Sequence, residues 1–239
     1  MRLSKRNFAE TREITIETNV NCHAEGSCII NFGQTKILCT ASFEAEIPRF
    51  LRGKNQGWLT ATYSMLPRST HSRINRESST GKVSGRTQEI QRLIGRSLRS
   101  AIDLSILGER QIFIDCDVLQ ADGGTRTAAI SGGYVALALC IRKLLKEGVL
   151  KENPLKKNIA AISCGISANQ AIIDLDYLED SNIDVDANFI LSADKKIIEI
   201  QASAEGDIFS KDELDQMYEL ALAGCNKIFD LQNEAINNS

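Results

Sequence analysis

The pattern of apolar and polar positions near the start of the chain predicts three strands. Polar and apolar residues alternate over Glu13–Thr18, which is typical of a strand with one buried face. Two further apolar runs, Ser27–Phe32 and Lys36–Phe43, stand on either side of Gly33 and Gln34. A glycine-containing turn this short indicates that the second and third strands are joined tightly, as in a β-hairpin.

The clearest helical pattern covers Arg86–Leu107. Its apolar and small residues recur at helical spacing and form one face, which consists of Ile90, Leu93, Ile94, Ser97, Leu98, Ala101 and Ile102. At ~100° per residue, Arg92, Arg96 and Arg99 fall within a sector of ~60° on the opposite side. Gly108 follows this pattern and is predicted to end the helix.

The rest of the chain mixes strands with crossover helices. Further strands are predicted at Gln111–Leu119, Ile159–Ile166, Ala171–Asp176, Ala187–Ser192 and Ile197–Ser203, the last two joined by a turn over Ala193–Lys196. Two more helices are predicted at Thr127–Lys146 and at Lys211–Asn226 or a little beyond. We therefore expect an α/β fold of mixed α+β layers in a single domain covering residues 1–239, with a frayed polar tail at about 230–239.

The charges of the chain are divided between two regions. A net charge of −3 by itself argues against a nucleic-acid-binding protein. However, Arg49–Arg99 holds eleven Lys or Arg against two Asp or Glu, and Gln170–Glu219 holds three Lys against fourteen Asp or Glu. This division fits a protein that holds a polyanion with one region and a metal with the other, although two solvated faces of opposite sign would look the same.

Cysteines and terminal segments indicate a cytoplasmic protein. The seven cysteines show no C-x-x-C spacing and lie mostly in apolar runs, so we expect buried free thiols in a reducing compartment. Only two histidines are present, which argues against a structural zinc site. Met1–Asn7 has no apolar signal core, and the apolar stretch Ala128–Ile141 is too short to span a bilayer. We expect no membrane contact.

A glycine-containing segment between a predicted strand and a predicted helix suggests an anion site. Gly123 and Gly124 let the backbone turn tightly, and the following helix points its positive end at the same place. Thr125 adds a hydroxyl, and Arg126 adds a forked cation suited to phosphate oxygens. A simple glycine turn with a solvated Arg126 explains the same spacing. The phosphate-loop pattern of nucleoside triphosphatases is absent, since Val83 follows the Gly81-Lys82 pair.

Two aspartates six positions apart are candidate metal ligands. Asp180 and Asp186 would lie ~20 Å apart on an extended chain. Ser181 and Asn182 are turn formers that would bring both carboxylates to one hard cation such as Mg²⁺. An acidic surface loop is the alternative interpretation. Spacing does not choose among the neighbouring acidic residues, which include Asp174, Asp176, Glu179 and Asp184.

The segment Arg68–Gly85 is predicted to be a long surface loop, because it is rich in Ser, Thr, Gly and Arg and poor in apolar residues. Arg68, Arg73 and Arg76, with His71, can follow an RNA backbone electrostatically. A solvated loop without function has the same composition.

Together these segments resemble the RNase PH family. The residues that carry the resemblance run in family order from about residue 24 to residue 210: Ala24–Ser27, Leu38–Ala41, Met65–Arg68, Gly85–Thr87, Glu89–Arg99, Gly108–Arg110, Ile114–Asp117, Gln120–Arg126, Asp174–Tyr177, Glu179–Ser181 and Ala204–Gly206. The long run Glu89–Arg99 and the Gly-Gly-Thr-Arg run are highly specific in combination.

The resemblance implies a phosphate-dependent 3′-to-5′ exoribonuclease that trims transfer-RNA precursors and other RNA 3′ ends. Such an enzyme releases nucleoside 5′-diphosphates and adds nucleotides in the reverse, nucleotidyltransferase direction. The implied fold is an RNase PH-type core of mixed sheets with crossover helices, like the second domain of a small-subunit ribosomal protein. Related enzymes form a ring that is a trimer of dimers, so we expect a hexameric homo-oligomer.

The resemblance also assigns roles to residues. The attacking inorganic phosphate would be bound by Arg86, Gly124, Thr125 and Arg126. Asp180 and Asp186 would be the catalytic residues and would hold a divalent metal, Mg²⁺ or Mn²⁺. RNA would be contacted by Arg68, Arg73, Arg76, Arg92 and Arg99.

The chain departs from the family pattern at positions that we expect to be peripheral. Arg12-Glu13-Ile14 stands where the family has Arg-Pro-Val, Ala187 replaces a methionine, and the turn at Ser192 lacks a glycine. Two alternative functions remain: a catalytically silent RNA-binding ring subunit and a hydrolytic exonuclease. The scarcity of histidines agrees with phosphorolysis, because phosphate is already an anionic nucleophile and needs no histidine base.

Overall fold

Two β-sheets with helices between and beside them make up the structure, a computed structural model that describes residue 2, residues 4–205 and residues 208–239, without the side chain of Thr80. The strands are β1 (Ile14–Thr18), β2 (Gly26–Phe32), β3 (Thr35–Glu44), β4 (Trp58–Met65), β5 (Gln111–Gln120), β6 (Ile159–Ser167), β7 (Gln170–Ile173), β8 (Val185–Ser192) and β9 (Ile197–Ala204). The helices are α1 (Glu77–Thr80), α2 (Gly85–Ala101), α3 (Leu104–Leu107), α4 (Thr125–Lys146), α5 (Tyr177–Asp180) and α6 (Lys211–Asn237), with a 3₁₀ turn at Arg49–Leu51. Met1, Leu3 and Gly206, which belong to segments interpreted above, lie outside the described residues.

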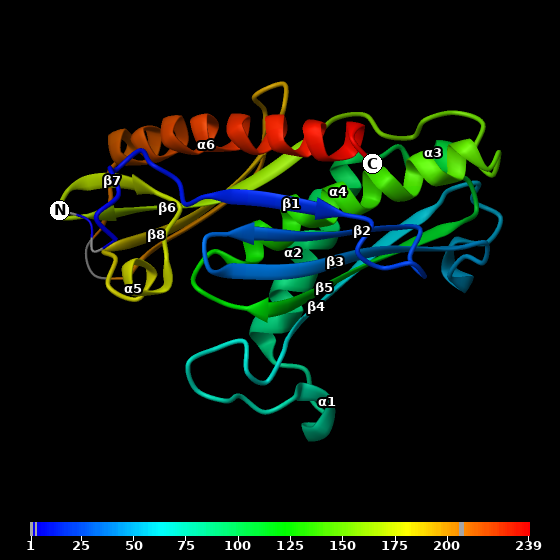
Figure 1. Cartoon of the computed structure of the whole chain (residues 1–239). Coiled ribbons are helices and arrows are strands. Elements are labelled where there is room, and N and C mark those ends of the chain that lie inside the picture. Colours follow the sequence, from blue (N-terminus) through cyan, green and yellow to red (C-terminus); the bar gives the residue numbers. More distant parts are fainter. Residues whose placement is uncertain (1, 3, 206–207) are drawn as a thin grey trace.

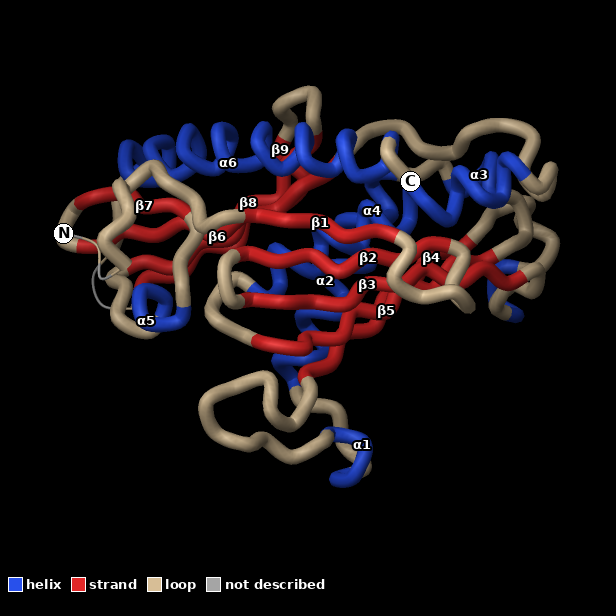
Figure 2. The backbone as a smooth tube through the Cα atoms, viewed as in Figure 1, coloured by secondary structure: helices blue, strands red, loops and turns tan. Residues whose placement is uncertain are grey.

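The sheets differ in strand order and direction. The first has the order β1-β2-β3-β5-β4 and is antiparallel except for the parallel pair β4–β5. The second has the order β7-β6-β8-β9 and is antiparallel throughout. Helix α4 packs against β2 and β3 on one side and against β6 on the other, α2 packs on β4, and α6 packs on β6 and β7 (Figures 1 and 2). The predicted mixed α+β fold is confirmed.

Helix α4 is the buried centre of the molecule. Its 22 residues are long and apolar enough to cross a membrane, so the sequence analysis, which considered only Ala128–Ile141, underestimated the length of this apolar segment. Its apolarity has another explanation, because 83% of its most apolar window is buried inside the protein. Gly26 of β2 lies so close to α4 that a Cβ there would stand 2.1 Å from the Ala136 carbonyl oxygen. One hydrophobic cluster extends from the first sheet through α4 to the second.

The predicted hairpin and thiols agree with the structure. Phe32 pairs with Thr35 across the two-residue turn, and Gly33 adopts the left-handed conformation, with φ of 55°. Six of the seven cysteines are buried free thiols, whereas Cys22 is exposed.

The predicted helix Arg86–Leu107 is divided into α2 and α3. Ile102 is extended and forms an isolated bridge with Leu155. Asp103 then caps α3, because its side chain accepts a hydrogen bond from the Ser105 N–H. Aspartate favours a cap over a helix interior, which explains why the apolar periodicity continued across the break. Gly108 ends the segment with a φ of 67°, as expected.

Two further elements differ from the prediction. Strand β4 was not predicted, and its alternation of buried and exposed residues begins at Trp58, directly after a glycine. Helix α1 forms one turn inside the predicted loop Arg68–Gly85. The remainder of that segment is irregular and projects from the body of the protein (Figures 1 and 2).

The end of the chain is helical, so the expectation of a frayed tail at 230–239 was wrong. Helix α6 continues to Asn237 because residues in this part contact the core. Gln232 is fully buried and donates hydrogen bonds to the carbonyl oxygens of Ser131 and Ile159, both at 3.0 Å. Arg142 donates to the carbonyl oxygens of Ile236 and Ser239. The polar side chains of this segment therefore make tertiary hydrogen bonds, which composition alone does not reveal.

We predict that Gln232→Ala lowers the free energy of unfolding by about 1–3 kcal/mol, because two buried carbonyl oxygens lose their donor. Urea denaturation followed by circular dichroism measures this change. Gln216→Ala, at an exposed position on the same helix, is the control and should change stability by less than ~0.5 kcal/mol. Equal stabilities of the two variants would contradict the role given to Gln232.

Candidate functional site

A pocket of about 310 Å³ lies where the two sheets meet. Its walls come from the β5–α4 turn, the start of α2, the single turn α5 and the strands β6 and β8. The lining residues are Met65, Thr70, Arg86, Ala121, Gly123, Gly124, Thr125, Arg126, Ser163, Tyr177, Asp180, Asp186 and Asn188. All six residues predicted for phosphate and metal binding are among them.

The β5–α4 turn depends on its two glycines. Gly123 and Gly124 have φ of 75° and 65°, values that other residues rarely adopt. A Cβ on Gly123 would stand 2.5 Å from the Leu175 carbonyl oxygen. Thr125 starts α4 and shares a 2.9 Å hydrogen bond with the Tyr63 hydroxyl. The turn thus presents the positive end of a 22-residue helix to the pocket.

Two arginines from separate helices, Arg86 of α2 and Arg126 of α4, line the same pocket. Arg126 donates a 3.1 Å hydrogen bond to the Gln201 side chain and lies 3.7 Å from a Glu89 carboxylate oxygen. Arg86 is exposed and makes no hydrogen bond or ion pair with another described residue. Burial raises the pKa of Asp180 and of Asp186, and the positive charges of Arg86 and Arg126 partly oppose that rise. The two guanidinium groups therefore lie beside the acidic pair, as the sequence led us to expect.

The chain brings the two aspartates together by a helical turn followed by a reversal. Asp176 begins α5 with a reciprocal capping box, in which its side chain accepts from the Glu179 N–H. The chain then turns at Ser181 and Asn182, and the Asn182 side chain donates to the Leu178 carbonyl oxygen at 2.8 Å. Strand β8 begins at Val185, which is earlier than predicted. Asp180 and Asp186 thereby line one pocket.

The neighbouring acidic residues have other partners. Asp174 and Glu179 are buried in ion pairs with arginines of the N-terminal segment. Asp176 caps α5, and Asp184 accepts a hydrogen bond from the Ala168 N–H. These contacts distinguish Asp180 and Asp186 from the neighbouring acidic residues, which sequence spacing alone did not. Strand β7 ends at Ile173, earlier than predicted, because Asp174 takes a left-handed conformation with φ of 55°.

The aspartate pair suits a hard divalent cation. Burial, and then repulsion by Asp180, raise the pKa of Asp186 to about 6, and burial also raises the pKa of Asp180. A bound cation would offset both effects. Within residues 2, 4–205 and 208–239, no group of three or more His, Cys, Asp or Glu is placed to hold a metal. Two carboxylates with several water or phosphate oxygens are the coordination that Mg²⁺ prefers.

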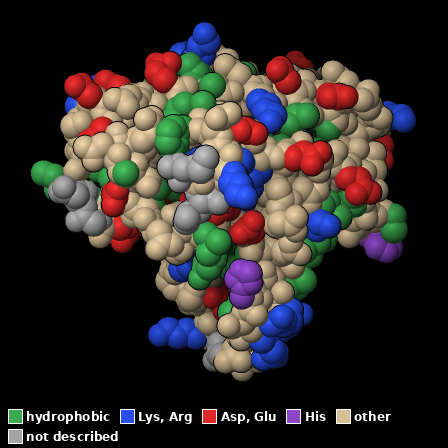
Figure 3. Space-filling model, turned by 60° about the vertical axis from the view of Figure 1, so that its left-hand side comes forward, with side chains coloured by type: hydrophobic (Ala, Val, Ile, Leu, Met, Phe, Trp, Pro, Cys, Tyr) green, Lys and Arg blue, Asp and Glu red, His purple; other side chains and the backbone are tan. Residues whose placement is uncertain are grey.

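The predicted RNA-binding arginines lie outside the pocket. Arg68, Arg73 and Arg76 are exposed on the projecting loop, where Lys and Arg side chains gather at the lower end of Figure 3. Arg92 is exposed on α2. Arg99 is held by the protein itself, because its guanidinium lies 5.0 Å from the Trp58 ring centroid and donates to the Leu59 carbonyl oxygen.

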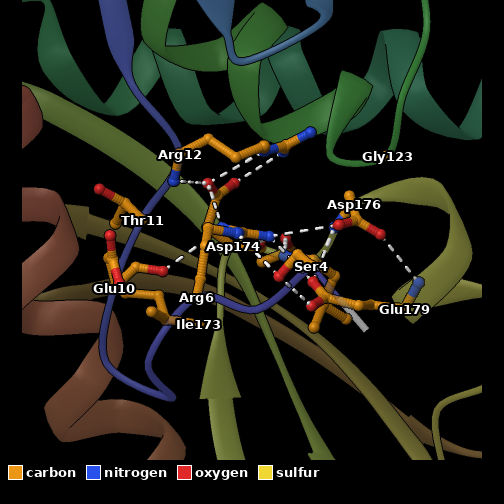
Figure 4. A network of polar contacts seen from close by, with 12 residues as sticks. Ser4, Arg6, Glu10, Thr11, Arg12, Gly123, Ile173, Asp174, Asp176 and Glu179 are labelled. Carbon is orange, nitrogen blue, oxygen red and sulfur yellow. Dashed lines mark hydrogen bonds and ion pairs between the residues drawn. The ribbon is translucent and has the colours of Figure 1, made fainter. Parts of the chain in front are cut away.

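Arginines of the N-terminal segment support the pocket from behind, and sequence reasoning missed them. The Arg12 guanidinium donates two hydrogen bonds to the Asp174 carboxylate, at 2.7 and 3.0 Å, and the Arg12 backbone N–H donates a third at 2.7 Å (Figure 4). The guanidinium also donates to the Asp122 carbonyl oxygen in the glycine turn. It is buried, so our view of its neighbourhood as peripheral was wrong. Arg12 joins the turn to the strand that precedes α5.

Two more arginines anchor α5 itself. Arg2 makes two 2.8 Å bonds to the carboxylate of Glu179, whose side chain is 3% exposed. Arg6 lies within 3.5 Å of carboxylate oxygens of Asp174, Asp176 and Glu179 (Figure 4). Nothing in a sequence pattern distinguishes such buried arginines from a solvated basic terminus.

Sequence comparison matches both halves of the chain to one family. Residues 10–142 match the model described as "3' exoribonuclease family, domain 1", and residues 157–224 match domain 2. A protein named Ribonuclease PH from Cereibacter sphaeroides is 55% identical over 99% of this chain and 100% of its own length. A second Ribonuclease PH, from Methylocella silvestris, is 53% identical with the same coverage.

Solved structures share the fold at low sequence identity. The crystal structure of Rrp46 from rice has a TM-score of 0.80 and 19% identity, covering 98% of this chain and 100% of that one. The Archaeoglobus fulgidus exosome with RNA bound to its active site has a TM-score of 0.80 and 20% identity, covering 96% of this chain and 91% of that one.

The ion pair between Arg2 and Glu179 should make the stability of the protein depend on pH in the acid range. Burial by itself raises the pKa of Glu179, but hydrogen bonds from Arg2 and Ser4 overcome this and lower it to about 2. A lowered folded-state pKa stabilises the protein above the ordinary value of about 4.5, and this contribution is lost as the pH falls toward 2. The change is on the order of 3 kcal/mol.

We therefore expect Glu179→Gln to be less stable than wild type at pH 7 and to lose less stability between pH 4.5 and pH 2. Denaturant unfolding at a series of pH values measures both quantities. Glu219→Gln, at an exposed position of α6, is the control and should follow the wild-type curve. Parallel curves for Glu179→Gln and wild type would show that the ion pair contributes nothing to acid sensitivity.

Proposed function

The chain belongs to the RNase PH family of 3′ exoribonucleases and is a phosphorolytic 3′ exoribonuclease, and we propose that the pocket between the β5–α4 turn and α5 is where it cleaves RNA. One observation carries this proposal. The glycine turn at the start of α4, Arg86 and Arg126 line the same pocket as Asp180 and Asp186. Arginines of the N-terminal segment pair with Asp174 and Glu179 instead.

Inorganic phosphate is the co-substrate in this proposal. Gly124, Thr125 and Arg126 would hold it against the start of α4, and Arg86 would supply a second guanidinium from the opposite wall. These groups place an oxygen of the phosphate in line with the last phosphodiester bond of the RNA. That oxygen forms a bond to phosphorus, and the bond from phosphorus to the 3′ oxygen of the preceding ribose breaks.

The products follow from this bond exchange. The terminal nucleotide leaves as a nucleoside 5′-diphosphate, and the shortened RNA takes up a proton on its new 3′ hydroxyl. No water molecule is consumed, so the free-energy change is small and the reverse reaction adds nucleotides from diphosphates. This reversibility is the basis for describing the protein as a nucleotidyltransferase as well.

The catalytic role of Asp180 and Asp186 is to hold Mg²⁺, or Mn²⁺, beside the reacting phosphate groups. A bound divalent cation would offset the charge that develops on the phosphoryl oxygens. Repulsion between the two neighbouring carboxylates supports this role, because a cation would relieve it. The positive charges of Arg86 and Arg126 oppose the rise in the pKa of Asp180 that burial causes, which favours the ionised carboxylate that a metal ligand needs.

Transfer-RNA precursors and other RNA 3′ ends are the proposed substrates. The basic projecting loop with Arg68, Arg73 and Arg76 would hold the body of the RNA at a distance from the pocket, with Arg92 along the α2 surface. The name of the relatives and the likeness to exosome subunits support a ring-shaped homo-oligomer, for which we propose a hexamer of three dimers. Buried free thiols support a cytoplasmic location.

Two alternatives differ from this proposal. A catalytically silent ring subunit would not need the phosphate and metal residues, all of which line the pocket here. A hydrolytic exonuclease would need an activated water, and neither histidine lines the pocket.

We predict that Arg126→Ala reduces kcat/KM for phosphate by about 100-fold or more, because it removes a charge from the reacting anion. Phosphorolysis of a transfer RNA with extra 3′ nucleotides measures this, and circular dichroism checks the fold. Arg52→Ala, at an exposed position outside the pocket, is the control and should retain wild-type kinetics. Full activity of Arg126→Ala would refute the phosphate role.

We also predict that the wild-type protein shortens this RNA only when inorganic phosphate and Mg²⁺ are both present, and that the product is a nucleoside diphosphate. Thin-layer chromatography of labelled products identifies the released nucleotide. Monophosphate release without phosphate would favour hydrolysis. Absence of either product would favour a silent subunit.

A further inference from the structure

One polar side chain that lines the pocket has no assigned role and forms no hydrogen bond or ion pair with another described residue. Asn188 lies on β8, two positions after Asp186, so both residues project from the same face of the strand. It lines the pocket, and only 5% of its surface is exposed. Among the described residues, none forms a hydrogen bond or ion pair with its side chain. The Asn188 carboxamide is not among the enclosed polar atoms of the described residues, so it reaches the open space of the pocket and is available to a group held there.

The other buried polar groups around it are already paired. The Ser163 hydroxyl accepts from the Leu175 N–H at 3.0 Å, and Thr125 bonds to Tyr63. Gln201 accepts from Arg126 and donates to Glu89 at 3.0 Å. Asn188 differs from these three neighbours, because none of the described residues bonds to its side chain.

The position of Asn188 in the sheet points to the group that it binds. In the strand register, Asn188 is opposite Ser163 on β6 and opposite Gln201 on β9. The Ser163 hydroxyl lies 3.7 Å from the place that a Cβ on Gly124 would occupy, and Gln201 holds Arg126. The neighbours of Asn188 on both sides thus adjoin Gly124 and Arg126. Asn188 lies beneath the space between them.

We propose that the Asn188 side-chain amide donates a hydrogen bond to a phosphoryl oxygen held between Gly124 and Arg126, which makes Asn188 a further catalytic residue of the phosphorolytic reaction. The inference rests on the function proposed above. A carboxamide is suited to this place because it donates to an anion without adding charge beside Asp186. The oxygen belongs either to inorganic phosphate or to the phosphodiester of the RNA, and kinetics distinguish these sources.

The first experiment compares Asn188→Ala with wild type at saturating Mg²⁺. Loss of a contact to inorganic phosphate raises KM for phosphate about tenfold and leaves KM for RNA within about twofold. Loss of a contact to the RNA phosphodiester instead lowers kcat about tenfold, with KM for phosphate within about twofold. Either result supports the proposal. All three constants within twofold of wild type would overturn it. Activity restored by raising Mg²⁺ above the concentration that saturates wild type would also overturn it, because it indicates a metal ligand.

Thermal unfolding separates this role from a structural one. Because the Asn188 side chain bonds to no other described residue, Asn188→Ala should unfold in phosphate-free buffer at the wild-type temperature or above. If the contact is to inorganic phosphate, the variant should gain less stability than wild type on addition of that anion. A variant that fails to fold, or unfolds far below wild type, would overturn the proposal, since it would reveal internal bonding.

Two variants complete the design. Asn188→Asp keeps the shape of the side chain but replaces the donor with a negative charge. It should therefore reduce kcat/KM for phosphate more than Asn188→Ala does. Wild-type kinetics of Asn188→Asp would overturn the proposal. Asn158→Ala is the control, because that carboxamide bonds to Asn233 and Tyr134, both at 2.7 Å, and should lower stability while leaving the kinetic constants within about twofold. If wild type itself releases no nucleoside diphosphate, the proposed function fails, whatever the variants show.

Discussion

Burial of α4 between the two sheets is the constraint on which the rest of this structure depends. The helix contacts β2 and β3 with one face and β6 with the other, so its axis cannot move without opening the core. Its first residues therefore stand at a fixed place beside the second sheet. The glycine turn, Thr125 and Arg126 are held at the edge where β8 presents Asp186. The glycine turn with Thr125 and Arg126 therefore lies beside Asp180 and Asp186, although these segments are far apart in the sequence, because one apolar helix packs against both sheets.

Two arginines and two aspartates line the same pocket, and no ion pair joins an arginine of this set to an aspartate of it. Arg126 is held by the Gln201 side chain and lies 3.7 Å from Glu89, and Arg86 makes no ion pair with a described residue. No described residue forms an ion pair with Asp180 or Asp186, whereas buried arginines pair with Asp174 and Glu179. Unpaired charges in a partly buried pocket are unfavourable for the protein alone. They suit a site that receives an anion and a cation together.

Particular residues show how far the sequence could lead. The apolar face of α2 and the glycine turn were predictable, because helical periodicity and positive φ are local properties of the chain. The family resemblance singled out Asp180 and Asp186 from six acidic residues, whereas spacing alone did not. The structure gives the physical basis for that choice, since Arg2, Arg6 and Arg12 lie more than 160 positions from their partners. The roles of the pocket residues, and the single-domain interpretation, stay predictions.

By itself, the sequence determined the order of most strands and helices, the buried thiols and the family to which the chain is similar, because these depend on local pattern and on runs of specific residues. Only the tertiary structure decided which charges are buried, that the polar end of α6 is helical, and that Asn188 lines the pocket without a partner among the described residues. The physical reason is the same in each case. The partners of a buried polar group come from distant parts of the chain, and no local pattern records the distance between them.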